Sequence, residues 1–354
     1  MMEVVELTGA WLEDWDRLVD SSTQGTLFHS SWWLLAHVGS RRLNAADRVR
    51  FLGVTENGRL IAGMPITYRR ILGRSFIMPP YVTPYLGPVI APCDYRSSTD
   101  LSRRKQIHSL LAAELRSAGF LLSYPFNYGV QDMQPYLWAG LTPTLRYTYV
   151  LNIESVERAV EGFDHRLAVV LRKFERQPYA VGTCSDAEFD ELVNETLARN
   201  RKRIRNTTLT TRLIYLAREH GRAEVFAARD AAGRLISACG MVWDKRRAYL
   251  LASGTRRVDN SVKSGLVMHC IRYAATQLRL CELDFDASMI PSIERYYRAW
   301  GAELRPVLGI GSALYTSYLA LRRAAAARAM RPAPRGQTGR IGRVGQVAES
   351  GRLG

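Results

Sequence analysis

The side chains best suited to chemistry lie near the end of the second half of the sequence. Residues 291–306, PSIERYYRAWGAELRP, carry two adjacent tyrosines on a short helix that Pro291 can begin and Gly301 can end. A phenol can return a proton to a leaving thiolate, because the reference pKa values of the two groups lie near ~10 and ~8.5. Tyr297 is therefore a candidate general acid and Tyr296 a candidate substrate-binding residue. Packing in a core would also explain this aromatic cluster.

Two carboxylates precede this segment, in the sequence LDFDAS. Asp284 and Asp286 are expected to point to the same side of a strand, because side chains alternate along a strand with a period of two. A neighbouring pair of carboxylates tends to raise the pKa of one member, which suits a base that accepts the proton of an attacking amine. Asp286 is the candidate base, and pairing of both acids with arginines is the alternative.

A candidate anion site precedes both segments in RRVDNSVKSGL, where a helix is expected to begin near Ser261. The N-terminus of a helix presents unpaired N–H groups and about half a positive charge. Lys263 and either Arg256 or Arg257 would add positive charge. Gly265 would let a ligand approach the backbone closely. A capped surface helix without a ligand is the alternative. The predicted phosphate-binding residues are Asn260, Ser261, Val262, Lys263, Ser264 and Gly265.

Two further segments could bind substrate. Residues 199–205, RNRKRIR, contain five cations, of which Arg201 and Lys202 could bind tRNA phosphates or another anionic acceptor. A solvated helix end is the alternative for this segment. The segment PPYVTPYLGP is stiffened by proline, and its Tyr81 and Tyr85 are expected to line a rigid rim at a cleft between domains, where ligands commonly bind.

The elements that would position these residues form an internal repeat. Residues 49–68, VRFLGVTENGRLIAGMPITY, and residues 223–243, AEVFAARDAAGRLISACGMVW, share one pattern of an apolar strand, a polar turn and a second apolar strand. In both copies the second strand opens with the tetrad GRLI, at 58–61 and 233–236. The glycine of each tetrad lies where a hairpin turn favours positive φ. The repeat therefore predicts two antiparallel hairpins in corresponding places.

Each hairpin is followed by a third strand, a long helix and a further strand. The long helices are expected at about 101–118 and 261–279, and the strands after them in FLLSYPF and CELDFDAS. Shorter helices are expected at 7–19, where Leu7 joins an apolar stripe, and at 186–199. This pattern predicts an α/β protein with mixed α+β sheets in two similar domains.

The predicted domains are residues 1–155 and 156–325, with a deep cleft between them. Residues 326–354 form a tail rich in Arg, Gly and Pro, whose lack of apolar periodicity predicts disorder. Eight arginines and one glutamate lie between positions 321 and 354 of a chain with net charge +16. Such an excess attracts anionic partners without choosing among them.

Composition limits the classes of function. A length of 354 residues, 47% hydrophobic and 23% charged, is typical of a globular chain of about two domains. The five cysteines are scattered without a Cys-x-x-Cys pair, and the histidines form no ligand pair, so neither a disulfide framework nor a metal site is expected. No apolar run reaches the ~18 residues of a membrane span, and no leader is evident. A cytoplasmic protein without a sequence-specific DNA-binding motif is therefore expected.

The order of these elements resembles that of the GNAT acyltransferase superfamily. Hairpin, strand, helix, strand and a short helix with Tyr-x-x-x-Gly, from Tyr297 to Gly301, follow one another as in that superfamily. The duplicated pair, together with TLFHSSWW, LRKFER, FDAS and YYRAWGAELRP, looks like the FemABX-related branch of tandem GNAT-like proteins. The resemblance covers residues 5–320, and its motifs are individually loose but correspond in order and spacing.

The resemblance implies transfer of an acyl group to a primary amine of an unidentified acceptor, a small molecule or a cell-wall or polysaccharide precursor. In CoA-using relatives the helix N-terminus holds the pyrophosphate and the tyrosine protonates the thiolate. These roles fall on residues 260–265 and on Tyr297, with acyl-CoA as co-substrate. In Fem peptidyltransferases the donor is aminoacyl-tRNA. Transfer from acyl-CoA is the expected activity, and tRNA-dependent transfer or a non-catalytic envelope assembly module are the alternatives.

Overall fold

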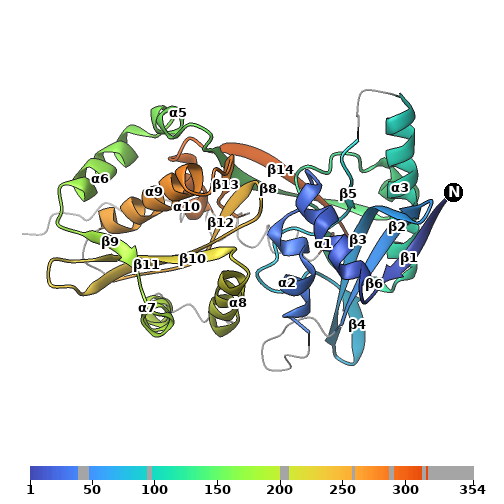
Figure 1. Ribbon diagram of the computed structural model, residues 1–354, viewed down its shortest axis with the longest axis horizontal. Helices are drawn as coiled ribbons and strands as arrows, with labels where there is room; N and C mark the ends of the chain where they lie inside the picture. Colours follow the sequence, from blue (N-terminus) through green and yellow to red (C-terminus); the bar gives the residue numbers. More distant parts are fainter. Residues whose placement is uncertain are drawn as a thin grey trace, which may run out of the picture. The chain divides into compact units, whose positions relative to one another are not determined.

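The computed structural model describes residues 1–38, 48–93, 98–199, 207–256, 260–286, 291–312 and 316–317. The described residues up to Ser312 belong to one compact unit. The described part of this unit contains two sheets, one mainly from each half of the chain (Figure 1). The expected mixed α/β class is confirmed, with two sheets in the described residues. The predicted tail, residues 326–354, lies outside the described residues.

The first sheet has the order β1-β2-β3-β4-β6, and β5 pairs with β3. Its strands are β1 (Met2–Leu7), β2 (Arg48–Glu56), β3 (Arg59–Ile71), β4 (Arg74–Ile77), β5 (Val89–Ile90) and β6 (Phe120–Leu121). Helices α1 (Trp11–Ser21) and α3 (Ser98–Ser117) pack against it. Trp15 of α1 lies so close to Gly63 that a Cβ there would come within 2.7 Å of the indole. Glycine at this position therefore lets the helix lie flat on the sheet.

The second sheet has the order β7-β14-β8-β13-β12-β11-β10-β9. Its strands are β7 (Ser123–Pro125), β8 (Thr142–Asn152), β9 (Ala180–Thr183), β10 (Ala223–Arg229), β11 (Leu235–Trp243), β12 (Arg247–Thr255), β13 (Glu282–Asp284) and β14 (Glu303–Gly311). Two of these strands, β7 and β8, precede residue 155. The sheet is therefore completed by strands from the first half of the chain.

Helices cover both faces of the second sheet. The helices of the second half are α5 (Val156–Glu161), α6 (His165–Glu175), α7 (Asp186–Arg199), α8 (Thr207–Glu219), α9 (Asn260–Thr276) and α10 (Pro291–Arg298). Figure 1 shows α5, α6 and α9 on one side of β10 and β11, and α7 and α8 on the other. The shorter elements η1 (Leu27–His29), α2 (Ser31–Leu35) and α4 (Gln134–Trp138) belong to the first half.

Both predicted hairpins are present. The first turn places Asn57 at φ +52° and Gly58 at +76°, and the second places Gly233 at +77°. In both halves the tetrad GRLI begins at or just before the second strand of the hairpin. The long helices α3 and α9 begin within three residues of their expected starts. One expectation is wrong, because Leu7 ends β1 and packs as a strand residue instead of beginning a helix.

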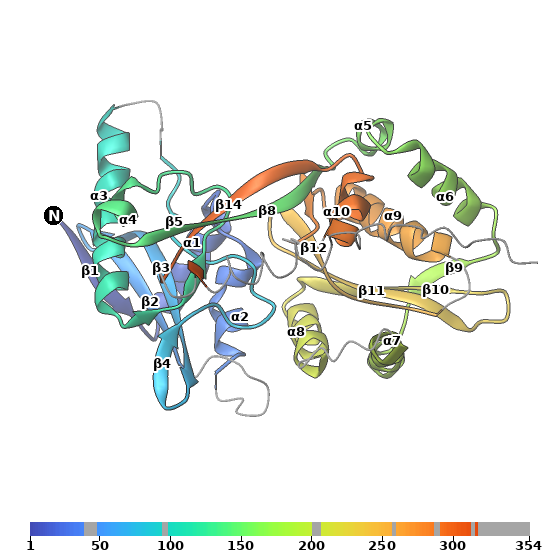
Figure 2. The same cartoon turned by 180° about the vertical axis from the view of Figure 1, so that it is seen from behind.

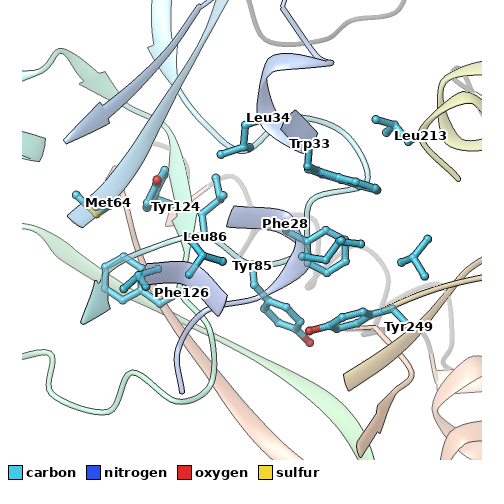
Figure 3. Close-up of a cluster of buried hydrophobic side chains, with 14 of the residues drawn as sticks. Phe28, Trp33, Leu34, Met64, Tyr85, Leu86, Tyr124, Phe126, Leu213 and Tyr249 are labelled. Atoms are coloured by element: carbon cyan, nitrogen blue, oxygen red, sulfur yellow. The ribbon is translucent and has the colours of Figure 1, made fainter. Parts of the chain in front are cut away.

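An aromatic core joins the two halves (Figure 3). Phe28 lies 4.8 Å from Tyr249 of β12 and 6.3 Å from Tyr85, measured between ring centroids. Buried Arg247 adds polar contacts, donating to the Gly25 carbonyl at 3.2 Å and to Tyr128 at 2.6 Å. The start of β12, which leads into the candidate site, is thereby fixed to the N-terminal segment.

Candidate active site

A cavity of about 200 Å³ lies between β11, β12, α9 and α10. It is lined by side chains from all four elements and from the end of β13: Ser237, Cys239, Leu250, Leu251, Ala252, Ser253, Lys263, Leu266, Val267, Phe285, Tyr296 and Tyr297. Three of the residues predicted from sequence, Lys263, Tyr296 and Tyr297, therefore meet around one space. The remaining lining is mostly apolar.

The pairing of β12 with β13 explains why there is space for a cavity. These parallel strands pair only from Arg247 to Tyr249, opposite Glu282 to Asp284. Beyond this point β12 runs on to Thr255 while β13 has ended. Beyond Tyr249, β12 therefore has no partner in β13. Its residues 250–253 line the cavity together with residues of α9 and α10.

A β-bulge lies at the same point of β12. Gly240 of β11 pairs with Ala252 and Met241 pairs with Leu250, so Leu251 has no partner in the register. A bulge leaves the extra residue outside the ladder and turns its backbone groups away from their usual partners. Leu251 also lines the cavity, so the bulge lies at the cavity wall.

Tyr297 of α10 enters the cavity with its ring stacked on Phe285, at a centroid distance of 4.8 Å. Burial, together with the negative charges of Asp286 and Asp284, raises the pKa of Tyr297 to about 12. The phenol is therefore protonated at neutral pH, the form that a general acid requires, while its pKa lies further above that of a thiol than the pKa of a free phenol does.

Tyr296 and Lys263 form the other side of the cavity. The Lys263 ammonium lies 4.8 Å from the centre of the Tyr296 ring, an arrangement in which the ring face attracts the cation. Lys263 is exposed and also lines the cavity, so its charge lies at the boundary between the cavity and solvent. Burial raises the pKa of Tyr296 above that of a free phenol, and its hydroxyl is protonated as well.

The start of α9 differs in part from the predicted phosphate site. The helix begins at Asn260, as the prediction requires, but Ser261, Val262 and Ser264 are buried. The expectation that a ligand approaches the backbone closely at Gly265 is wrong, because the Phe174 ring of α6 fills the space where a Cβ would lie. Arg256 is held by Glu195 through two contacts of 3.0 and 3.1 Å, and Arg257 lies outside the described residues. Of the predicted groups, Lys263 lines the cavity and the first backbone N–H groups of α9 lie at the same end of the helix.

The two aspartates do not share one strand face as expected. Asp284 ends β13 and is completely buried, with Oδ1 accepting from the Thr148 hydroxyl at 2.7 Å and the Asp286 N–H at 3.0 Å. Burial raises the pKa of Asp284 to about 7. Asp286 lies beyond the strand with φ +58°, so strand alternation no longer decides its direction. After burial, its negative charge is the next contribution to the raised pKa of Tyr297.

The remaining predicted substrate residues lie elsewhere. The expectation that Tyr85 lines a rim is wrong. This residue is 0% exposed and packs against Phe28 and Tyr128 in the aromatic core. Figure 3 shows its hydroxyl directed toward that of Tyr249. Tyr81 is 39% exposed and is not part of the cavity lining. Arg201 and Lys202 lie outside the described residues.

Sequence reasoning missed two groups at the site, the bulge residue Leu251 and the thiol of Cys239. The run YLLAS in β12 departs from strict alternation of apolar and polar residues, which fits a bulge and equally fits a strand buried on both faces. Cys239 is 3% exposed and lies close enough to Tyr296 and Tyr297 to influence both hydroxyls. No signal in the sequence pointed to Cys239, because its strand, LISACGMVW, reads as an ordinary, mostly apolar buried strand.

Among the described residues, no group of three or more His, Cys, Asp or Glu side chains is placed to hold a metal ion. Nor does any helix in these residues combine the length and the apolar character needed to cross a membrane.

Comparison with known proteins identifies the fold. No protein-family model and no curated protein matches the sequence. The solved structure of FemX superposes with a TM-score of 0.64 over 90% of this chain and 99% of its own, at 13% identity. The C-terminal domain of a putative lysylphosphatidylglycerol synthetase from Agrobacterium fabrum gives 0.52 over 89% and 95%, at 14% identity. L-PGS from Bacillus licheniformis gives 0.52 over 89% and 97%, at 12% identity. The chain therefore has a FemABX-related fold, similar to that of FemX.

Proposed function

We propose that this protein is an acyltransferase that moves an acyl group from a CoA thioester to a primary amine. The observation that carries the proposal is the cavity itself, in which the protonated Tyr297, the bulge at Leu251 and the Lys263 ammonium surround one space. The fold, whose solved relatives include FemX, supports the general class of reaction.

Each of these groups has a role in the proposed reaction. The thioester carbonyl lies against the backbone of the bulge at Leu251, where N–H groups stabilise the developing oxyanion. The neutral amine attacks the carbonyl carbon, so that a C–N bond forms and the C–S bond breaks. The departing thiolate takes the proton of the Tyr297 hydroxyl. The proton released by the amine goes to a base, and the phenol regains a proton from solvent.

Asp286 is the proposed base. Its backbone N–H is held by Asp284 Oδ1, so the position of its carboxylate depends on the buried aspartate. Besides burial, the negative charge of Asp286 raises the pKa of Tyr297, which supports placing both groups at one site. Whether the proton passes directly or through a water, the site offers an acid and a base with different environments.

The anionic end of the donor is proposed to bind at the start of α9. Asn260 begins the helix, and the N-terminus of a helix favours phosphate through its unpaired N–H groups and its dipole. Lys263 adds a cation at the same end and lines the cavity. The charge near the helix start and the phenol deeper in the cavity match a donor with phosphates at one end and a thioester at the other.

The acceptor is proposed to be a small molecule or a cell-wall or polysaccharide precursor that carries a primary amine. All five cysteines are free thiols, which supports a reaction in the reducing cytoplasm, where CoA thioesters are available. Arg201 and Lys202 are retained as candidate contacts to an anionic part of this acceptor.

A second candidate donor is aminoacyl-tRNA. The superposition on FemX over nearly the whole of both chains favours it, and the basic segment 199–205 offers charge for tRNA phosphates. The same Tyr297 would then act on the ester of the tRNA instead of a thioester.

Thermal stability with each donor separates the two candidates, because a ligand that binds the native state raises the melting temperature. Acetyl-CoA, a longer acyl-CoA and charged tRNA are compared on the wild type and on Lys263→Ala. A melting shift with an acyl-CoA that Lys263→Ala reduces supports the proposal. A shift only with charged tRNA, lost at high salt, replaces it with the second candidate. No shift with any donor contradicts both.

A further inference from the structure

The hairpin of β3 and β4 ends in an unusual turn. Ile71 pairs with Arg74, so Leu72 and Gly73 form a two-residue connection with φ values of +48° and +79°. Turns of this kind favour Asn, Asp or Gly at both positions, because a Cβ is strained at positive φ. Leu72 is nevertheless 99% exposed, so no burial offsets the strain. An apolar side chain is thus presented to the outside at the tip, against local backbone preference.

One face of this hairpin continues the apolar surface away from the tip. Cross-strand partners share a face, so the pairs Arg69 with Phe76 and Ile71 with Arg74 lie on the same side. Phe120 of β6 pairs with Phe76 and is 64% exposed, and the two rings lie 6.2 Å apart. Leu72, Ile71, Phe76 and Phe120 therefore form an apolar strip, which we call the hairpin strip, flanked by two arginines.

The segment that carries most of the hairpin strip has side-chain charges of one sign. Residues 57–93 contain four arginines and no aspartate or glutamate. Arg69 and Arg74 make no ion pair with any residue that the structure describes, whereas the nearby Arg48 and Arg50 are paired with Glu6. Figures 1 and 2 both show the turn between β3 and β4 extending past the other strands of the first sheet. The tip can therefore reach a flat surface before the rest of the sheet does.

We propose that the hairpin strip docks on an anionic phospholipid surface. Leu72 would enter the boundary between headgroups and acyl chains, with Phe76 and Phe120 behind it, while Arg69 and Arg74 contact lipid phosphates. This combination of apolar and basic side chains is the one that holds peripheral proteins at a bilayer. Four apolar side chains cover much less area than the roughly 1,200 Å² that a stable protein interface buries. This small area favours a membrane over a protein partner. The inference is independent of the proposed reaction.

The test is flotation of the full chain with vesicles of phosphatidylcholine alone and of phosphatidylcholine with 30% phosphatidylglycerol. We expect binding to the anionic vesicles only. Leu72→Asn is expected to weaken it roughly tenfold, since the leucine no longer enters the apolar region. Arg69→Gln and Arg74→Gln are each expected to weaken it about fivefold. Matched controls are Leu101→Ser, on exposed Leu101 of α3, and Arg234→Gln, at the tip of the β10–β11 hairpin.

Leu72→Asn is also expected to change the melting temperature and vesicle binding in opposite directions. Asparagine tolerates positive φ better than leucine, so this variant is expected to raise the melting temperature by about 1–3 °C while it loses vesicle binding. A lower melting temperature would contradict the strain at Leu72. Equal vesicle binding by the wild type and all three hairpin variants would overturn the proposal and leave the arginine-rich tail as the lipid contact. Loss on arginine replacement without loss on Leu72→Asn would also overturn it, in favour of a soluble polyanion.

Discussion

Replacing Tyr297 with phenylalanine tests the assigned chemistry while leaving the packing almost unchanged. The ring stacks on Phe285 and lines the cavity, and phenylalanine can keep both contacts. Only the hydroxyl is removed. Loss of a positioned general acid typically slows a reaction by ~10²–10⁴-fold. We therefore expect kcat to fall at least about a hundredfold, while the melting temperature and the acyl-CoA affinity stay close to those of the wild type.

The pH dependence follows from the environment of the phenol. Because the pKa of Tyr297 is raised to about 12, the hydroxyl remains protonated throughout the neutral range. The ratio of wild-type to variant kcat should therefore be constant between about pH 6 and pH 9. A loss of the wild-type advantage within this range would show that a group of lower pKa supplies the proton.

The assay measures the free thiol that acyl-CoA releases in the presence of a panel of primary amines. Tyr273→Phe is the matched control, because Tyr273 lies on α9 in the same core, against Phe226, but outside the cavity. Its kcat should match that of the wild type. A Tyr297→Phe variant that retains kcat within about threefold would refute the general-acid role.

Three further substitutions test the structure around the site. Asp284→Asn should increase the free energy of unfolding above about pH 7 and leave it unchanged near pH 4, because the buried carboxyl has a pKa of about 7 against 3.8 in the unfolded chain. The wild type is thus favoured when protonated and loses stability as pH rises, by at most about 4 kcal/mol, and urea unfolding at both pH values measures the difference. Gly265→Ala should lower stability by about 1–3 kcal/mol, because the new Cβ meets the Phe174 ring, and Phe174→Leu should restore part of it in the double variant. Independent losses that simply add would argue against this contact. Arg247→Met should cost about 3–5 kcal/mol in urea unfolding, because Glu282 and the carbonyls of Thr23 and Gly25 lose their buried partner. A loss below about 1 kcal/mol would mean that the guanidinium does not fasten the two halves.

Local sequence signals predicted much of the second half correctly. The hairpin glycines, the start of α9 and the short helix after Pro291 all depend on residues within a few positions of one another, so they can be read from the sequence. These elements bring Lys263 and Tyr297 to one cavity. The part of the site that follows from local structure was therefore predictable.

Features that depend on distant strands were not predictable in the same way. Strand β8 pairs with β13, about 130 residues later in the chain, and this pairing places Thr148 near Asp284. Tyr85 looked like a surface residue in a proline-rich loop, but the aromatic core between the halves buries it. The contact of Phe174 with Gly265 likewise arises only when α6 packs on α9. Such contacts are set by tertiary packing, which overrides the local reading of a turn or a helix start.

The most direct test of the central claim is a crystal structure of the protein with CoA bound. The account predicts phosphates at the start of α9 near Lys263 and the thiol sulfur inside the cavity, within hydrogen-bonding distance of the Tyr297 hydroxyl. A CoA bound elsewhere, or one whose thiol lies away from Tyr297, would contradict the assignment of this cavity as the site of acyl transfer.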